Sequence, residues 1–152
     1  MTQEIKPTYV TREQANRLKE KEFDLPTYAY YSGLNFYTGE YKNHSQTTIG
    51  DTPMHKMLIG YTSAPEQWQV VEWLRVNHEI EVYALRYTFS KGEFVGKKYM
   101  FVVEKYKKNF NPDLDEYHFE EEPLESSREL NYNSPQEAYS AAFDHILNNN
   151  LI

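Results

Sequence analysis

Cysteine is absent from this 152-residue sequence, and basic residues, glycine and long apolar runs are scarce. Without cysteine the chain cannot form a disulfide, a thiolate metal site or a cysteine nucleophile. Its 16 Lys and Arg against 23 Asp and Glu give a formal net charge of -7, which argues against nucleic acid or an anionic membrane as the main partner. No apolar run approaches the roughly 20 residues of a membrane helix, and MTQEIKPTYV lacks the apolar core of a signal peptide. We therefore expect a cytoplasmic protein.

Recognisable catalytic and metal-binding motifs are missing as well. The six glycines form no phosphate loop, there is no GxSxG elbow, and the five histidines show no HxH, HxxxH or HExxH spacing. His44, Asp51 and His55 share the polar stretch Lys42–Pro53, but such loops are common without metal, so we predict no metal site and no cofactor. The carboxylates of Glu120–Glu122 are typical of a solvated strand end. The sequence offers no catalytic residue.

What the sequence does contain predicts a folded α+β domain spanning residues 1–152. Hydrophobic residues make up 39% and aromatic residues 16%, enough for a core in a chain of this length. We expect an N-terminal helix, an irregular aromatic segment, a second helix, a three-stranded antiparallel meander and a C-terminal helix. The corresponding ranges are 11–22, 27–41 (a strand or hairpin), 64–77, 80–89, 97–107, 116–120 and 135–149, with a brief strand at 57–61 and an open polar loop at 42–53.

Three capping patterns set the predicted helix starts. Thr11 is followed three residues later by Gln14, and each of the motifs SAPE (63–66) and SPQE (134–137) places serine three residues before glutamate. On a helical wheel that begins at Ala64, one face collects the residues that we expect to be buried. These are Ala64, Trp68, Val71, Leu74 and His78, with Val70 and Trp73 beside them. In the last helix the expected apolar stripe consists of Ala138, Tyr139, Ala142, Phe143 and Ile146.

Charge is divided between the predicted strands. Lys91–Lys108 holds six lysines against two glutamates, and Asp113–Glu129 holds eight acidic residues against one arginine. One interpretation is a bipolar surface for a charged partner. We favour the other, in which neighbouring antiparallel strands pair opposite charges and so fix their register.

Tyrosine is the compositional anomaly, with 14 residues. Tyrosine is amphipathic and enriched where a surface is buried on binding, although it also serves as a strand former and half-buried cover of small sheets. From the irregular N-terminal third we predict a partner-binding set: Tyr30, Tyr31, Phe36, Tyr37 and Tyr41. If these rings form an interface, replacing both Tyr31 and Tyr37 by alanine should weaken partner capture and leave the melting temperature nearly unchanged.

Three segments carry a resemblance to a known group of proteins. VTREQANRLKEKEFDLPTYAYY (10–31), APEQWQVVEWLRVNHEIEVYA (64–84) and NSPQEAYSAAFDHIL (133–147) are together similar to small uncharacterised proteins encoded by bacteriophages and mobile elements of gut bacteria. Where those proteins usually read EKGF, with glycine capping the first helix, this chain has Lys21-Glu22-Phe23, so the helix must end in another way.

The resemblance implies a phage origin and no assigned activity. We expect a small non-enzymatic phage or prophage accessory protein in the cytoplasm of a bacterial host, acting by binding a host or phage protein. Two alternatives stay open: a virion or assembly component whose aromatic face is buried in a homo-oligomer, and a small enzyme with an unrecognised carboxylate or histidine site.

Overall fold

A computed structural model describes residues 7–38, 48–49, 52–53, 60–91, 94–111, 116–126 and 132–152. These residues form an α+β structure, as expected from the sequence. The elements are α1 (Arg12–Glu20), β1 (Ala29–Ser32), β2 (Asn35–Thr38), β3 (Thr48–Ile49), β4 (Thr52–Pro53), β5 (Tyr61–Ser63), α3 (Gln67–His78), β6 (Ile80–Lys91), β7 (Phe94–Asn111), β8 (Glu116–Ser126) and α4 (Pro135–Asn148).

The chain divides into two compact units, described separately below. The first comprises the residues up to Val70 together with Ile146–Ile152, and the second is Val71–His145. The division therefore falls inside α3 and inside α4. That residues 1–152 form a single domain stays a prediction.

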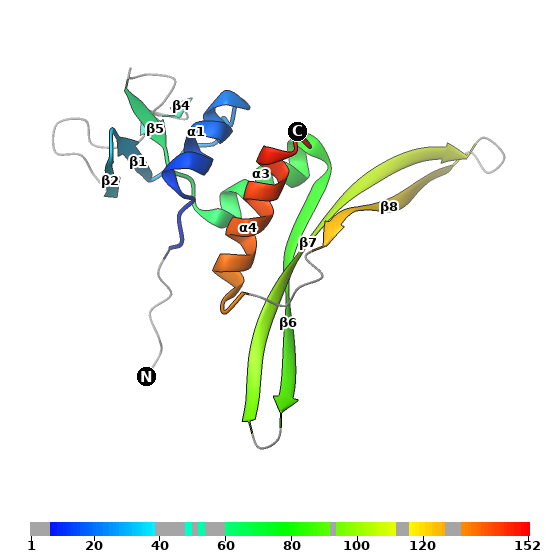
Figure 1. Ribbon diagram of the computed structural model, residues 1–152. Coiled ribbons are helices and arrows are strands. Elements are labelled where there is room, and N and C mark those ends of the chain that lie inside the picture. Colours follow the sequence, from blue (N-terminus) through cyan, green and yellow to red (C-terminus); the bar gives the residue numbers. More distant parts are fainter. Residues whose placement is uncertain are drawn as a thin grey trace. The chain divides into compact units, whose positions relative to one another are not determined.

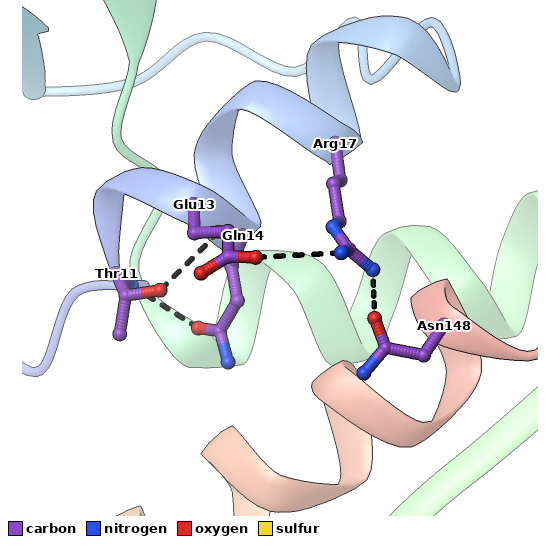
Figure 2. A network of polar contacts seen from close by, with 5 residues as sticks. All are labelled: Thr11, Glu13, Gln14, Arg17 and Asn148. Carbon is purple, nitrogen blue, oxygen red and sulfur yellow. Dashed lines mark hydrogen bonds and ion pairs between the residues drawn. The ribbon is translucent and has the colours of Figure 1, made fainter.

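The predicted start of α1 is confirmed, because Thr11 is its N-cap. The Gln14 N–H donates to Thr11 Oγ1 at 3.2 Å, and the Thr11 N–H donates to Gln14 Oε1 at 3.1 Å, which completes a capping box (Figure 2). One turn further along, the Arg17 guanidinium lies between Glu13 Oε1 and Asn148 Oδ1 and donates to both. The helix thus begins where its local sequence places it.

The end of α1 shows what replaces the missing glycine. Glu22 adopts a left-handed conformation with φ 60°. Its N–H donates to Lys19 O at 3.2 Å, and the Phe23 N–H donates to Leu18 O at 3.0 Å. This pair of bonds is a Schellman motif, and Leu18 and Phe23 are both buried beside it, as that motif favours. A non-glycine residue in this conformation carries strain of about 1 kcal/mol or more.

The first unit contains a small antiparallel sheet in the order β2-β1-β5. The hairpin predicted within residues 27–41 is confirmed as β1 and β2, which turn at Gly33, a glycine with φ 59°. Of the strand predicted at 57–61, residues 57–59 lie outside the described ranges, and β5 begins at Tyr61. A short pairing of β3 with β4 falls within the predicted loop Lys42–Pro53, whose other residues lie outside the described ranges.

The start of α3 differs from the prediction. Ser63 does not cap it, because Ser63 still belongs to β5 and pairs with Tyr30 of β1, and the helix begins only at Gln67. Instead, the side chain of Gln69 stabilises the start of the helix, because its Oε1 accepts the Glu66 N–H at 3.0 Å.

The predicted buried face of α3 is also partly wrong. Trp68 is 63% exposed, whereas Gln67, Val70, Trp73 and Leu74 are buried. These four positions follow the three- and four-residue spacing of a helix that starts at Gln67, so the buried stripe is rotated away from the one expected from Ala64.

In the second unit the three predicted strands form the expected antiparallel meander, in the order β6-β7-β8. β6 pairs with Phe94–Lys105 of β7, and β8 pairs with Val102–Asn111, with a register shift between Val103 and Glu104. Only Val102–Lys105 therefore has strands on both sides, and Figure 1 shows two long hairpins that share β7.

The register of β7 with β8 supports the cross-strand interpretation of the charge pattern. Lys105 lies opposite Glu122, and Lys107 lies opposite Glu120. Opposite charges facing each other across an antiparallel pair stabilise one register over its neighbours. Two of the six lysines of Lys91–Lys108 thus lie opposite glutamates in the register.

α4 matches its prediction closely. Ser134 Oγ accepts the Glu137 N–H at 3.2 Å, and Glu137 Oε2 accepts the Asn133 N–H at 2.9 Å. Of the predicted stripe, four residues are buried and one is half-buried; the buried ones are Ala138, Ala142, Phe143 and Ile146. In the second unit the Phe101 ring of β7 lies 6.2 Å from Tyr132 and 5.9 Å from His145, measured between ring centroids.

Candidate partner-binding surface

The structure separates the predicted partner-binding residues by burial. Phe36 and Tyr37 on β2 are 42% and 40% exposed, Tyr31 is half-buried, and Tyr30 is only 1% exposed. Tyr41 lies outside the described residues. A ring that is 1% exposed offers no area to a partner, so Tyr30 belongs to the core and not to the surface developed below.

One face of the hairpin holds a tyrosine stack. Tyr30 and Tyr37 lie opposite each other in the β1–β2 register, with ring centroids 5.2 Å apart and planes 16° apart. Tyr61 of β5 packs on the same Tyr30 ring at 5.4 Å. The exposed Tyr37 ring is therefore fixed from beneath by a buried one, and little conformational entropy remains for it to lose on binding.

The other face holds a row of three rings. Phe36 lies 5.2 Å from both Tyr31 and Tyr9 between ring centroids. The Tyr31 hydroxyl donates to Val10 O at 2.8 Å, and burial raises the pKa of that hydroxyl, an effect that the nearby Arg12 charge partly opposes. Because Tyr31 is bonded and half-buried, replacing it with alanine should lower stability, contrary to the expectation from sequence.

Two residues outside the predicted set extend this face. Tyr9 forms an isolated antiparallel bridge with Glu66, flanked by bonds from Val10 N to Pro65 O (3.0 Å) and from Gln67 N to Thr8 O (2.8 Å). The indole Nε1 of Trp68 donates to Glu66 Oε2 at 2.8 Å. Glu66 thus joins a tyrosine on the N-terminal segment to a largely exposed tryptophan at the start of α3.

We call this group the Tyr9 surface; it consists of Tyr9, Tyr28, Phe36, Glu66 and Trp68. Burial raises the pKa of the Tyr9 hydroxyl, and the electrostatic effects of Glu66 and then of Tyr28 raise it further. Tyr28 is 55% exposed. Neither Tyr9 nor Trp68 belongs to the partner-binding set predicted from the sequence.

The described residues hold neither a metal-binding cluster nor a helix that could cross a bilayer. Among them no cluster of three His, Asp or Glu side chains is arranged to hold a metal ion. His44, Asp51 and His55, the set considered from sequence, lie outside the described ranges. Of the described helices, none combines the length and the apolar character that a bilayer crossing requires.

Comparison of the chain with protein-family models, with curated proteins and with solved structures gives no significant match in any of the three.

Proposed function

We propose that the chain is a small non-enzymatic accessory protein of a phage or prophage that acts in the bacterial cytoplasm by binding a host or phage protein. The observation that carries the proposal is the β1–β2 hairpin. Among the strands that the structure describes, β2 is the edge strand of its sheet; all four of its residues are exposed, and two of them are aromatic. Exposed aromatic side chains are enriched at protein interfaces, and an open strand edge is a template for main-chain pairing.

The hairpin is well prepared for binding. Phe36 rests on Tyr31 and Tyr9, and Tyr37 rests on Tyr30. At the turn, Leu34 is 81% exposed. Two supported rings and one projecting leucine provide apolar contacts, and the edge of β2 provides backbone donors and acceptors to a partner strand. Because the rings are already positioned, ordering them on binding costs little free energy.

The test is affinity capture from a bacterial lysate, quantified by mass spectrometry, with the wild-type chain and two double variants. Phe36→Ser with Tyr37→Ser removes the hairpin rings. Leu85→Ser with Tyr87→Ser is the matched control on β6, where the exposed fractions are 38% and 42%. We expect a specific protein that the wild type and the control capture equally and that the hairpin variant loses by at least about tenfold. Equal capture by all three chains would contradict the proposal.

A second candidate function follows from the same edge strand, because a second copy of the chain can pair on β2 as readily as a different protein can. The chain would then be a virion or assembly component. Size-exclusion chromatography with light scattering separates the two: a monomer supports partner binding, and an obligate oligomer that the Phe36→Ser, Tyr37→Ser variant dissociates supports assembly.

A further inference from the structure

The Tyr9 surface combines aromatic rings with one carboxylate. Glu66 lies directly before α3, where the helix dipole stabilises negative charge. Its Oε2 accepts the indole N–H of Trp68, its backbone faces Tyr9 across an antiparallel bridge, and its side chain is half-exposed. Trp68 is 63% exposed. The carboxylate therefore sits at the edge of one accessible ring and beside another.

Within the described ranges, no lysine or arginine forms an ion pair with Glu66. Arg12 of α1 donates instead to Gly33 O at 3.4 Å. In this part of the chain, the negative charge of Glu66 is therefore available to an external cation.

We propose that the Tyr9 surface binds a lysine or arginine side chain of the partner protein, an inference that rests on the proposed function. A cation over the face of tryptophan or tyrosine is attracted by the ring quadrupole. The same cation can donate to the Glu66 carboxylate in a charge-assisted hydrogen bond. An apolar partner residue would instead bury that carboxylate without a counter-charge, which is costly. The net charge of -7 further favours approach of a basic segment.

The first test uses two synthetic Gly/Ser-rich peptides of equal length, one carrying arginines and the other carrying citrulline, the neutral isostere, at the same positions. Binding is followed by tryptophan fluorescence, since of the two tryptophans Trp68 is exposed and Trp73 is 3% exposed. We expect the arginine peptide to bind in a salt-sensitive manner and the citrulline peptide to bind at least about fivefold more weakly. Equal binding of the two peptides, or no binding of either, overturns the inference.

Two charge-matched variants locate the site. Glu66→Gln keeps an acceptor for the Trp68 indole and removes the charge, and Glu20→Gln removes one exposed charge at the end of α1. We expect Glu66→Gln to weaken the arginine peptide about fivefold and Glu20→Gln to leave its affinity within about twofold. Equal effects of the two variants on the affinity for the arginine peptide would show that only the net charge of the chain matters. That result would refute the cation site at Glu66.

The capture experiment keeps this inference separate from the proposed function. If Glu66→Gln retains the partner that Phe36→Ser with Tyr37→Ser loses, the hairpin binds a partner and the cation site is refuted. If both variants lose the partner while Glu20→Gln keeps it, both proposals are supported. If the hairpin variant keeps the partner, the proposed function fails, whatever the peptides do.

Discussion

The tyrosine stack of the β1–β2 hairpin allows a direct comparison of a core ring with a surface ring. Tyr30 and Tyr37 are the same residue type, lie opposite each other in the register and contact each other, yet they are 1% and 40% exposed. Truncating a fully buried large aromatic side chain costs about 3–5 kcal/mol. For Tyr37→Ala only part of the ring area and one ring–ring contact are lost, so we expect about 1–2 kcal/mol.

Urea unfolding followed by circular dichroism measures both losses, with Tyr30→Phe as the control that keeps the buried ring. We expect the free energy of unfolding to fall by at least about 1 kcal/mol more for Tyr30→Ala than for Tyr37→Ala, and by less than about 1.5 kcal/mol for Tyr30→Phe. The m-value should stay constant across the series. Equal losses for the two alanine variants would refute the argument, because Tyr37 would then be a core residue and unsuited to an interface.

Two further predictions concern α1 and Tyr31. Glu22→Gly should raise the free energy of unfolding by about 0.5–1 kcal/mol in urea denaturation, because glycine relieves the strain at φ 60° while the Schellman bonds remain; Glu22→Ala, which keeps the strain, should not. Burial raises the pKa of Tyr31 above 10.0, so the fold favours the neutral phenol, and this stability is present below pH 10.0 and lost as the pH rises through the folded value. In alkaline titrations followed by circular dichroism, Tyr31→Phe should unfold less steeply above that pH than the wild type, and an unchanged profile would contradict the assignment.

Local sequence was sufficient to predict the starts of α1 and α4 and the strands of the second unit. Two side-chain patterns supply acceptors to otherwise unpaired helical N–H groups: the capping box of Thr11 and Gln14 at α1, and the serine before α4. Both helices start as predicted. The alternation of β6, β7 and β8 likewise fixed their type and their antiparallel order. Such signals act within a few residues and need no information about distant parts of the chain.

The same kind of motif was misleading at Ser63. Its spacing to Glu66 repeats the one that succeeds at Ser134, but Ser63 is held in β5 by pairing with Tyr30, more than thirty residues earlier in the chain. That pairing keeps the backbone extended and delays the start of α3 to Gln67. A distant strand thus decided where the helix begins.

The sequence by itself determined the α+β composition, two of the helix starts, the hairpin position and the strand types, because capping, turn chemistry and side-chain alternation are local. Only the tertiary structure decided which aromatic residues are exposed. It buried Tyr30, half-buried Tyr31, left Phe36 and Tyr37 accessible, and placed Tyr9 beside Glu66. Tyrosine suits a core and a surface equally well, so its burial depends on which strands and segments pair across the fold, and composition and periodicity do not encode that choice.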